Sequence, residues 1–207
     1  MSVPQHVAKI NMNRIFVTSD THFGHQNIIR YANRPFADWR GMGESLIERW
    51  NKAVQPEDTV WFLGDFAMGP GATPQYVESV LNRLNGRIEV ILGNHDMPSK
   101  YSKGLLDLVL EKHFEERIRI LDNQIHEVKI DGQHFVMGHY PLEDWNGRSK
   151  GSVHLHGHTH NQFIRGDDNP FTKQPHGRFD IGVDMYGGPV QITGDLRYLY
   201  SSNGWEM

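Results

Sequence analysis

The chain contains no cysteine among its 207 residues. Disulfide bonds and thiolate metal sites are therefore excluded, and any metal must be held by imidazole, carboxylate or amide groups. The sequence has no run of roughly 18 apolar residues, the length that a membrane-spanning helix requires. Residues 1–13 also lack the apolar segment of a secretory signal. We therefore expect a soluble, cytoplasmic protein without a membrane partner.

Positive charge is not in excess either. The chain carries 21 Lys and Arg residues against 25 Asp and Glu residues, which gives a net charge of −4. A protein that binds nucleic acid by neutralising its phosphates has the opposite balance. A nucleic-acid partner is therefore not expected, although a local basic patch is compatible with these totals.

The sequence shows no internal repeat, no low-complexity tract and no linker long enough to divide it. A length of 207 residues suits one domain with a substantial core. We therefore predict a single domain over residues 1–207. Aromatic residues such as Trp39, Trp145 and Trp205 leave a homodimer open.

The first half of the chain alternates between short apolar runs and amphipathic segments. The runs predict strands at residues 14–18, 59–63 and 87–92. Residues 43–54 place their apolar side chains on one helical face, and Thr73-Pro74 is a typical helix start before a second such segment. This order of elements indicates a parallel α/β arrangement.

The second half is richer in strands, which the pattern predicts at 117–121, 125–130, 134–137, 153–156 and 179–183. Between two of them, Asp131-Gly132 predicts a tight hairpin turn. We therefore expect a mixed α/β fold of the α+β kind, with two mixed β-sheets flanked by helices.

Histidine is abundant, with 13 residues, and several of these histidines stand in short polar clusters. Each cluster follows a predicted strand. In α/β sheets, ligands bind beyond the carboxyl ends of the strands, so we expect the clusters to meet at one rim. The five clusters are Ser19-Asp20-Thr21-His22, Gly64-Asp65, Gly93-Asn94-His95-Asp96, Gly138-His139 and Gly157-His158-Thr159-His160.

The spacing within the clusters has a physical reading. Asp20 and His22 are two residues apart, and so are His158 and His160. In an extended chain such residues point to the same side, so each pair is expected to face one metal cluster. A glycine precedes a polar residue in four clusters, which would let the backbone approach a ligand closely. These glycines are Gly64, Gly93, Gly138 and Gly157.

Nitrogen and oxygen ligands without sulfur suit Mn, Fe, Zn, Ni or Co. The candidate ligands outnumber those that one ion needs, so we expect two divalent metal ions, with Asp65 in the middle as a bridge. Two ions about 3.5–4 Å apart form a clamp for in-line displacement at phosphorus, and they lower the pKa of bound water. The pattern therefore predicts hydrolysis of phosphate esters.

Taken in order, the five motifs resemble those of the calcineurin-like metallophosphoesterase superfamily. The resemblance implies a four-layer αββα sandwich and a dinuclear centre in which Mn is the most expected metal. It implies that Asp20, His22, Asp65 and His160 hold the first ion. It implies that Asp65, Asn94, His139 and His158 hold the second. His95 would then assist the leaving group, and Asp96 would orient His95.

Other residues near the motifs are candidates for substrate contacts, beside Asn94 and His95. His25 and Asn27 follow the first motif, and Arg148 shares a loop with Trp145, where a cation beside an aromatic ring suits a nucleobase or sugar. Arg30 and Arg34 are open between phosphate contacts and structural roles. His154 and His156 are interpreted as structural or supporting residues.

The expected activity is hydrolysis of a small phosphate ester, with a phosphodiester favoured, by attack of a metal-bridging hydroxide. A phosphomonoesterase and a nuclease would use the same site and remain alternatives. A catalytically silent metal-binding module on the same fold is a third alternative, because such a module would keep the shape without the reaction.

Overall fold

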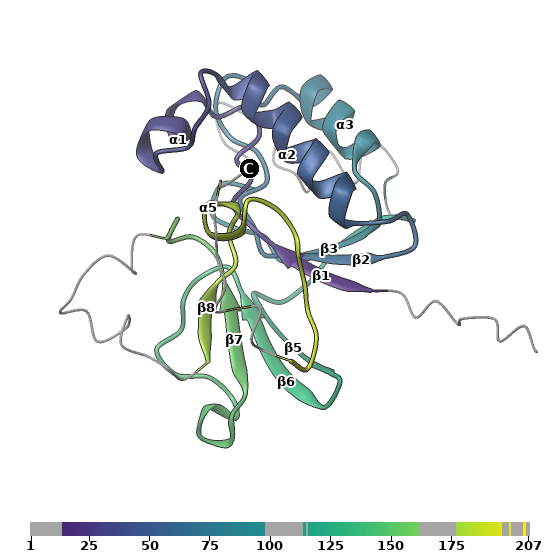
Figure 1. Ribbon diagram of the computed structural model, residues 1–207, viewed down its shortest axis with the longest axis vertical. Helices are drawn as coiled ribbons and strands as arrows, with labels where there is room; N and C mark the ends of the chain where they lie inside the picture. The colour runs from purple at the N-terminus through teal and green to yellow at the C-terminus, as the bar shows by residue number, and fades with distance from the viewer. Residues whose placement is uncertain are drawn as a thin grey trace, which may run out of the picture.

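Two mixed β-sheets lie at the centre of the computed structural model (Figure 1). The structure describes residues 14–97, 114, 116–161, 177–195, 199 and 205, so residues 1–13, in which no secretory signal is expected, lie outside it. One sheet has five strands in the order β4-β3-β2-β1-β9, and the other has four in the order β5-β6-β7-β8.

The five-stranded sheet is built mainly from parallel strands. They are β1 (Ile15–Thr18), β2 (Thr59–Phe62), β3 (Arg87–Val90) and β4 (Ile118–Ile120), and β9 (Val190–Gln191) pairs antiparallel with β1. The predicted strands at 14–18, 59–63, 87–92 and 117–121 are confirmed to within two residues at either end. Because the parallel strands point the same way, their carboxyl ends open at one edge of the sheet.

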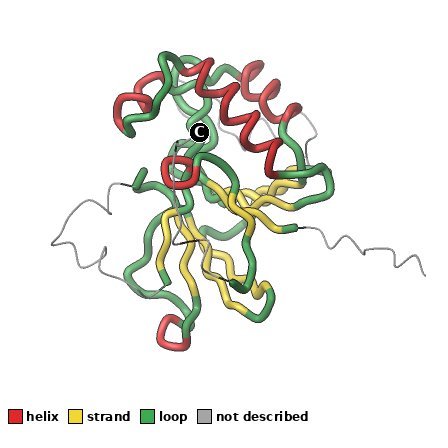
Figure 2. Tube along the Cα trace, in the orientation of Figure 1, coloured by secondary structure: helices red, strands yellow, loops and turns green. Residues whose placement is uncertain are grey.

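Helices cover one face of this sheet (Figures 1 and 2). They are α1 (Gln26–Tyr31), α2 (Trp39–Ala53) and α3 (Pro74–Arg83). Helix α2 begins at Trp39 rather than Gly43 because the Asp38 side chain accepts the amides of Arg40 and Gly41, at 2.8 Å each. Helix α3 starts as predicted, with Thr73 as its N-cap.

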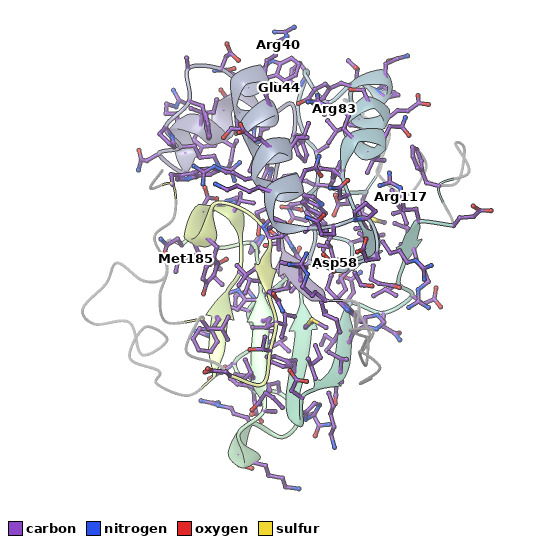
Figure 3. The ribbon with its side chains drawn as sticks, turned by 45° about the vertical axis from the view of Figure 1, so that its right-hand side comes forward. Arg40, Glu44, Asp58, Arg83, Arg117 and Met185 are labelled. Carbon is purple, nitrogen blue, oxygen red and sulfur yellow. The ribbon has the colours of Figure 1, made fainter. Side chains whose placement is uncertain are left out.

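Helices α2 and α3 also meet through a surface ion pair, in which Arg83 donates to both carboxylate oxygens of Glu44 (2.7 and 2.5 Å; Figure 3). Within the described part of the chain, no helix is long and apolar enough to cross a membrane.

The four-stranded sheet begins with the predicted hairpin. Strands β5 (Ile125–Ile130) and β6 (Gln133–Gly138) pair antiparallel, and the turn residues Asp131 and Gly132 both have positive φ angles, 49° and 83°. Strands β7 (Val153–His156) and β8 (Arg178–Asp180) add in parallel. Strand β8 ends earlier than the predicted 183, because the Asp180 side chain accepts the Gly182 amide at 2.8 Å and turns the chain into helix α5 (Val183–Tyr186).

The hydrophobic core has two parts, one on each face of the five-stranded sheet. Alternate residues of one strand enter different parts: Phe16 packs among the helices, whereas Val17 packs between the two sheets with Phe135 and Leu155. The two mixed sheets with their helices confirm the predicted α/β fold. The strands that carry the polar clusters are therefore fixed from both sides.

The outer face of the four-stranded sheet is covered, among the described residues, by the loop between β6 and β7. His154 on β7 holds this loop: its Nδ1 lies 2.9 Å from the carbonyl oxygen of Val136, and its Nε2 accepts the Leu142 amide at 3.0 Å. The Trp145 ring lies 5.4 Å from the imidazole. Burial lowers the pKa of His154 to about 4, so the ring is neutral at physiological pH.

His154 predicts a defined loss of stability in acid. In the unfolded chain, this histidine has a pKa of about 6.5 and binds a proton below that pH. In the folded chain, the imidazole binds a proton only near pH 4 and below. The free energy of unfolding that this group contributes is therefore complete above about pH 6.5, and up to about 3 kcal/mol is lost as the pH falls toward 4. Urea unfolding of the metal-free protein should show a shallower fall over this window in His154→Gln than in the wild type. Equal slopes would contradict the assignment.

Candidate metal centre

The polar clusters meet where the carboxyl ends of the strands of both sheets come together. Backbone hydrogen bonds join their loops: the Asp20 amide donates to the Gly64 carbonyl at 2.9 Å, and the Gly157 amide donates to the His139 carbonyl at 3.0 Å. Among the hydrogen bonds that cross between the sheets is one from the His158 amide to the Asp20 carboxylate, at 2.9 Å. The rim that the strand-end pattern predicts is therefore present in the structure.

Six of the candidate ligands form two groups. In each group, one possible ligand atom per residue lies within 4.8 Å of the others. Asp65 stands between the groups, because its Oδ2 atom is 3.6 Å from Nε2 of both His22 and His139. Asn94 belongs beside the second group, with its Oδ1 atom 3.0 Å from Nε2 of His139. The first group is Asp20, His22 and His160, and the second is Asp65, His139 and His158.

The backbone of these residues differs from the extended chain that the two-residue spacing suggested. Five candidate ligands have positive φ angles between 48° and 70°, a region that side chains other than glycine rarely adopt. The side chains converge through these left-handed turns, and His158 and His160 point to different groups. The backbone of both pairs is therefore not extended as expected, although Asp20 and His22 do face one group. The five residues are Asp20, His22, Asp65, His158 and His160.

Two of the glycines make room for carboxylates. A Cβ atom at Gly93 would overlap the Asp65 carboxylate, and one at Gly157 would overlap the Asp20 carboxylate. The predicted close approach of backbone to ligand is therefore confirmed at these positions.

The first group holds buried polar atoms that have no hydrogen-bond partner. They are both ring nitrogens of His22 and the Oδ1 atom of Asp20. Burial raises the pKa of Asp20 well above its usual value and lowers that of His22 well below. An unpartnered buried polar group costs about 1–3 kcal/mol, and a divalent cation at this point would give a partner to the Asp20 oxygen and to one of the His22 nitrogens. The residues therefore fit a metal ion, since neutral imidazole is the form that binds one.

A buried ion pair supports the first group from behind. The Arg34 side chain has no exposed surface, and its Nε and Nη2 atoms donate to the two oxygens of Asp184 at 2.8 Å each. Asp184 Oδ2 also lies 2.8 Å from Nδ1 of His160, which leaves Nε2 of that ring for a metal. Arg34 further donates to the backbone carbonyls of Asp20 and Thr21, at 2.7 and 2.9 Å. Of the two roles left open for Arg34, the structural one is correct.

The second group is supported by a backbone carbonyl and an aromatic ring. Nδ1 of His139 lies 2.8 Å from the Leu63 carbonyl oxygen, which directs Nε2 toward Asp65 and Asn94. The Tyr140 ring packs against His139 and His158, with centroid distances of 4.9 and 4.6 Å. Tyr140 was not predicted, although its place directly after a candidate ligand is a signal that the sequence offers.

Asp96 has different partners from those the resemblance implied. Its Oδ2 atom accepts the amides of Asp65 and Gly93, at 2.7 and 2.8 Å, and its Oδ1 atom accepts the Phe66 amide at 2.8 Å. All these bonds go to backbone groups, so Asp96 joins the loops after β2 and β3 rather than orienting the His95 ring. Burial raises the pKa of Asp96 to about 7, although the amides oppose the shift.

His95 stands at the open side of the centre. Its amide donates to Asp65 Oδ1 at 2.8 Å, its Nε2 atom is 4.0 Å from Asp65 Oδ2, and its side chain is 35% exposed. The ring lies 5.5 Å from that of His22. An imidazole in this position can reach a ligand that enters from solvent.

Of the other predicted substrate contacts, some lie near the metal groups and others lie away from them. His25 lines the first group, with its ring 5.5 Å from that of His22. Asn27 is exposed on α1, two residues beyond. Arg148 lies in the short 3-10 helix η1 (Arg148–Lys150) before β7, at the end of that strand away from the centre, and Trp145 is buried against His154. The prediction for this loop is therefore wrong, because the loop returns to the start of β7 before the chain reaches the rim.

With this geometry established, comparison with known proteins gives the family. The chain belongs to the calcineurin-like phosphoesterase superfamily, whose domain model matches residues 13–175. It is accordingly a metal-dependent phosphoesterase, an enzyme that uses divalent metals on phosphate esters.

Relatives of similar length are found in an archaeon and a phage. An uncharacterised protein of Methanocaldococcus jannaschii is 31% identical over 176 residues, 85% of each chain. The Gene 66 protein of Mycobacterium phage D29 is 32% identical over 192 residues, 84% of this chain and 90% of the phage protein. A solved structure of a protein of unknown function from Aquifex aeolicus superposes with a TM-score of 0.61 at 21% identity, over 86% of this chain and 95% of that one. This structural likeness shows the fold.

The ion pair behind the first group leads to a prediction. Asp184→Asn should lower the affinity of one metal equivalent by about 10- to 100-fold, because partners that orient a metal-binding histidine have effects of this size. The second equivalent should be little affected, since its ligands do not touch Asp184. Calorimetric titration of the metal-free protein with Mn measures both equivalents.

A matched control is Asp58→Asn, which breaks another ion pair in which the carboxylate is buried while the arginine is partly exposed. Arg14 donates to both oxygens of Asp58 (3.2 and 2.6 Å), and Asp58 lies apart from α5, where Met185 is labelled (Figure 3). This variant should lose stability and keep both metal affinities. Unchanged metal binding in a folded Asp184→Asn variant would contradict the assigned support.

Proposed function

We propose that the chain is a dinuclear phosphodiesterase. The observation that supports this most directly is the position of Asp65 Oδ2, 3.6 Å from Nε2 of one histidine in each group, where one carboxylate can serve two ions. Asn94 completes the second site, and Mn is the proposed metal, although the ligand set also suits Fe, Zn, Ni or Co. When bound, the two ions polarise the phosphoryl group and lower the pKa of a coordinated water, which supplies the attacking hydroxide.

His95 is proposed to donate a proton to the departing ester oxygen. Its ring is partly exposed beside the two groups, and its backbone amide is tied to the Asp65 carboxylate at 2.8 Å. That hydrogen bond holds the His95 backbone close to Asp65, so the ring can reach a leaving group that departs toward solvent. Asp96 acts through the backbone amides of the same two loops, as a positioning residue.

A diester fits the charge of the site better than a monoester does. A phosphate monoester carries two negative charges near neutral pH and is commonly bound by arginine. Arg34 donates to the loop that carries Asp20 and His22, and its guanidinium is buried and occupied by Asp184 and two carbonyl groups. A phosphodiester has a single negative charge and needs no such partner.

Removal and return of metal tests the proposal. After chelation, the protein should lose its hydrolysis of bis-p-nitrophenyl phosphate, and added Mn should restore it with close to two equivalents bound per chain. Plasma mass spectrometry on the assayed sample gives the metal content. Restored cleavage of p-nitrophenyl phosphate alone would make the enzyme a monoesterase, and metal binding without hydrolysis of either ester would favour the silent binding module.

His95→Ala should separate chemistry from metal binding. Because His95 belongs to neither metal group, the variant should keep close to normal metal content and lose about 10²- to 10⁴-fold in kcat, the usual contribution of a general acid. The loss should be largest for esters with poor leaving groups, such as alkyl alcohols, and smallest for p-nitrophenolate. Loss of metal with unchanged turnover would contradict this role.

A further inference from the structure

Several large hydrophobic side chains among the described residues are exposed to solvent. In the part of the chain that the structure describes, four such residues are 46% to 54% exposed, and they come from segments far apart in sequence. Single exposed hydrophobic residues are ordinary, whereas a group of them marks a surface that binds something. The four are Tyr31, Met97, Ile125 and Tyr140.

Tyr140 sits directly on the second metal group. Its ring lies 4.6 Å from that of His158 and 4.9 Å from that of His139, and its hydroxyl donates to Asn94 Oδ1 at 3.4 Å. The two imidazoles meet the ring at steep angles of 64° and 74°, so neither stacks flat on it. The residue is 46% exposed, so part of it is accessible to a ligand from solvent beside the second group.

The other three residues also flank the centre. The Tyr31 ring lies 6.4 Å from that of His25, which lines the first group. Met97 follows His95 by two residues. Ile125 pairs with Gly138, the residue before His139. All four residues are therefore neighbours, in space or along the chain, of residues of the centre, and we refer to them together as the apolar rim.

We propose that the apolar rim is a substrate subsite that binds a planar aromatic group, such as a nucleobase or an aryl ring, carried by the phosphodiester. Tyr140 stacks on that group, and Tyr31 contacts it or a second group across the centre. The proposal rests on the proposed phosphodiesterase function and names its substrate class. Tyr31 and Tyr140 are both aromatic, and aromatic side chains stack on the flat face of any base. A planar ring therefore fits these two side chains better than an alkyl chain does.

The Arg30 guanidinium adds to this chemistry on one side, since it lies 5.2 Å over the Tyr31 ring. A cation beside an exposed aromatic ring adds to the attraction between that ring and a stacked base. The sequence suggested such a pair at Arg148 and Trp145, but Trp145 is buried and the pair lies before β7, away from the centre. The aromatic residue beside the second metal group is Tyr140 instead.

The test compares p-nitrophenyl esters that lose the same leaving group. With the Mn-loaded full-length protein, p-nitrophenyl thymidine 5′-phosphate should have a lower KM than methyl p-nitrophenyl phosphate. Tyr140→Ala should reduce the ratio of kcat/KM for these two esters by roughly 5- to 150-fold, mainly through KM, the range expected for one stacked base. Tyr140→Phe should keep most of the ratio, because it keeps the ring.

Arg148→Ala is the matched control, since Arg148 also lies 5.2 Å over an aromatic ring but away from the centre. It should leave the ratio unchanged. An equal loss in this variant and in Tyr140→Ala would overturn the subsite, and so would equal KM values for the two esters in the wild type. A lower KM for hexyl p-nitrophenyl phosphate than for the thymidine ester would also overturn it, in favour of an alkyl chain.

Binding of the products separates this proposal from the proposed function. Calorimetry should show tighter binding of thymidine 5′-monophosphate than of methyl phosphate to the Mn-loaded wild type, and a smaller difference in Tyr140→Ala. That result in a protein that cleaves no ester would support the subsite and contradict the phosphodiesterase. Equal binding of both products by a protein that cleaves diesters would overturn the subsite alone.

Discussion

The hydrogen bond from the His158 amide to the Asp20 carboxylate joins the two sheets at the end where the metal groups lie. Asp20 follows the first strand of one sheet, and His158 follows the third strand of the other, 138 residues later. Gly157 makes the contact possible, because a side chain there would occupy the space of the carboxylate. Both metal groups depend on this junction, since each takes residues from both sheets.

The junction is held at a conformational cost. Left-handed backbone at a residue other than glycine costs on the order of 1–3 kcal/mol, and five candidate ligands adopt it. The surrounding structure opposes relaxation: Asp96 ties two loops through three amides, and Arg34 ties the Asp20 loop through two carbonyls. Strain of this kind gathers at functional sites, where the position of each side chain is worth more than local stability.

The sequence predicts the frame of this protein well, because strands such as 59–62 and 125–130 are short apolar or alternating runs bounded by turn residues. The candidate ligands are also recognisable, since each cluster follows its strand directly. Helix α1, helix α5 and strand β9 were not predicted, because six, four and two residues are too few to show a period.

Contacts between distant segments were the harder part. The residues around Arg34 in the sequence do not indicate that its partner lies 150 positions away. The groups that donate to Asp96 are backbone amides, which nearly any residue provides, so the sequence does not identify them. The direction of the loop with Trp145 and Arg148 depends on His154, whose imidazole looks like one more ligand in a histidine-rich run. Left-handed turns at Asp20 and His22 are likewise a product of the assembled fold, since extended chain is the simpler reading of their spacing.

The ion pair between Arg34 and Asp184 also sets an order in which parts of the protein can fold during synthesis. Arg34 leaves the ribosome 150 residues before the carboxylate that neutralises it. Until then, its guanidinium cannot be buried without an unpaired charge, a state that costs several kcal/mol. The first metal group can therefore form only after residue 184 has been made, although Asp20 and His22 precede even Arg34. A nascent chain is in this way kept from assembling this metal group before the strands of the second sheet have been made.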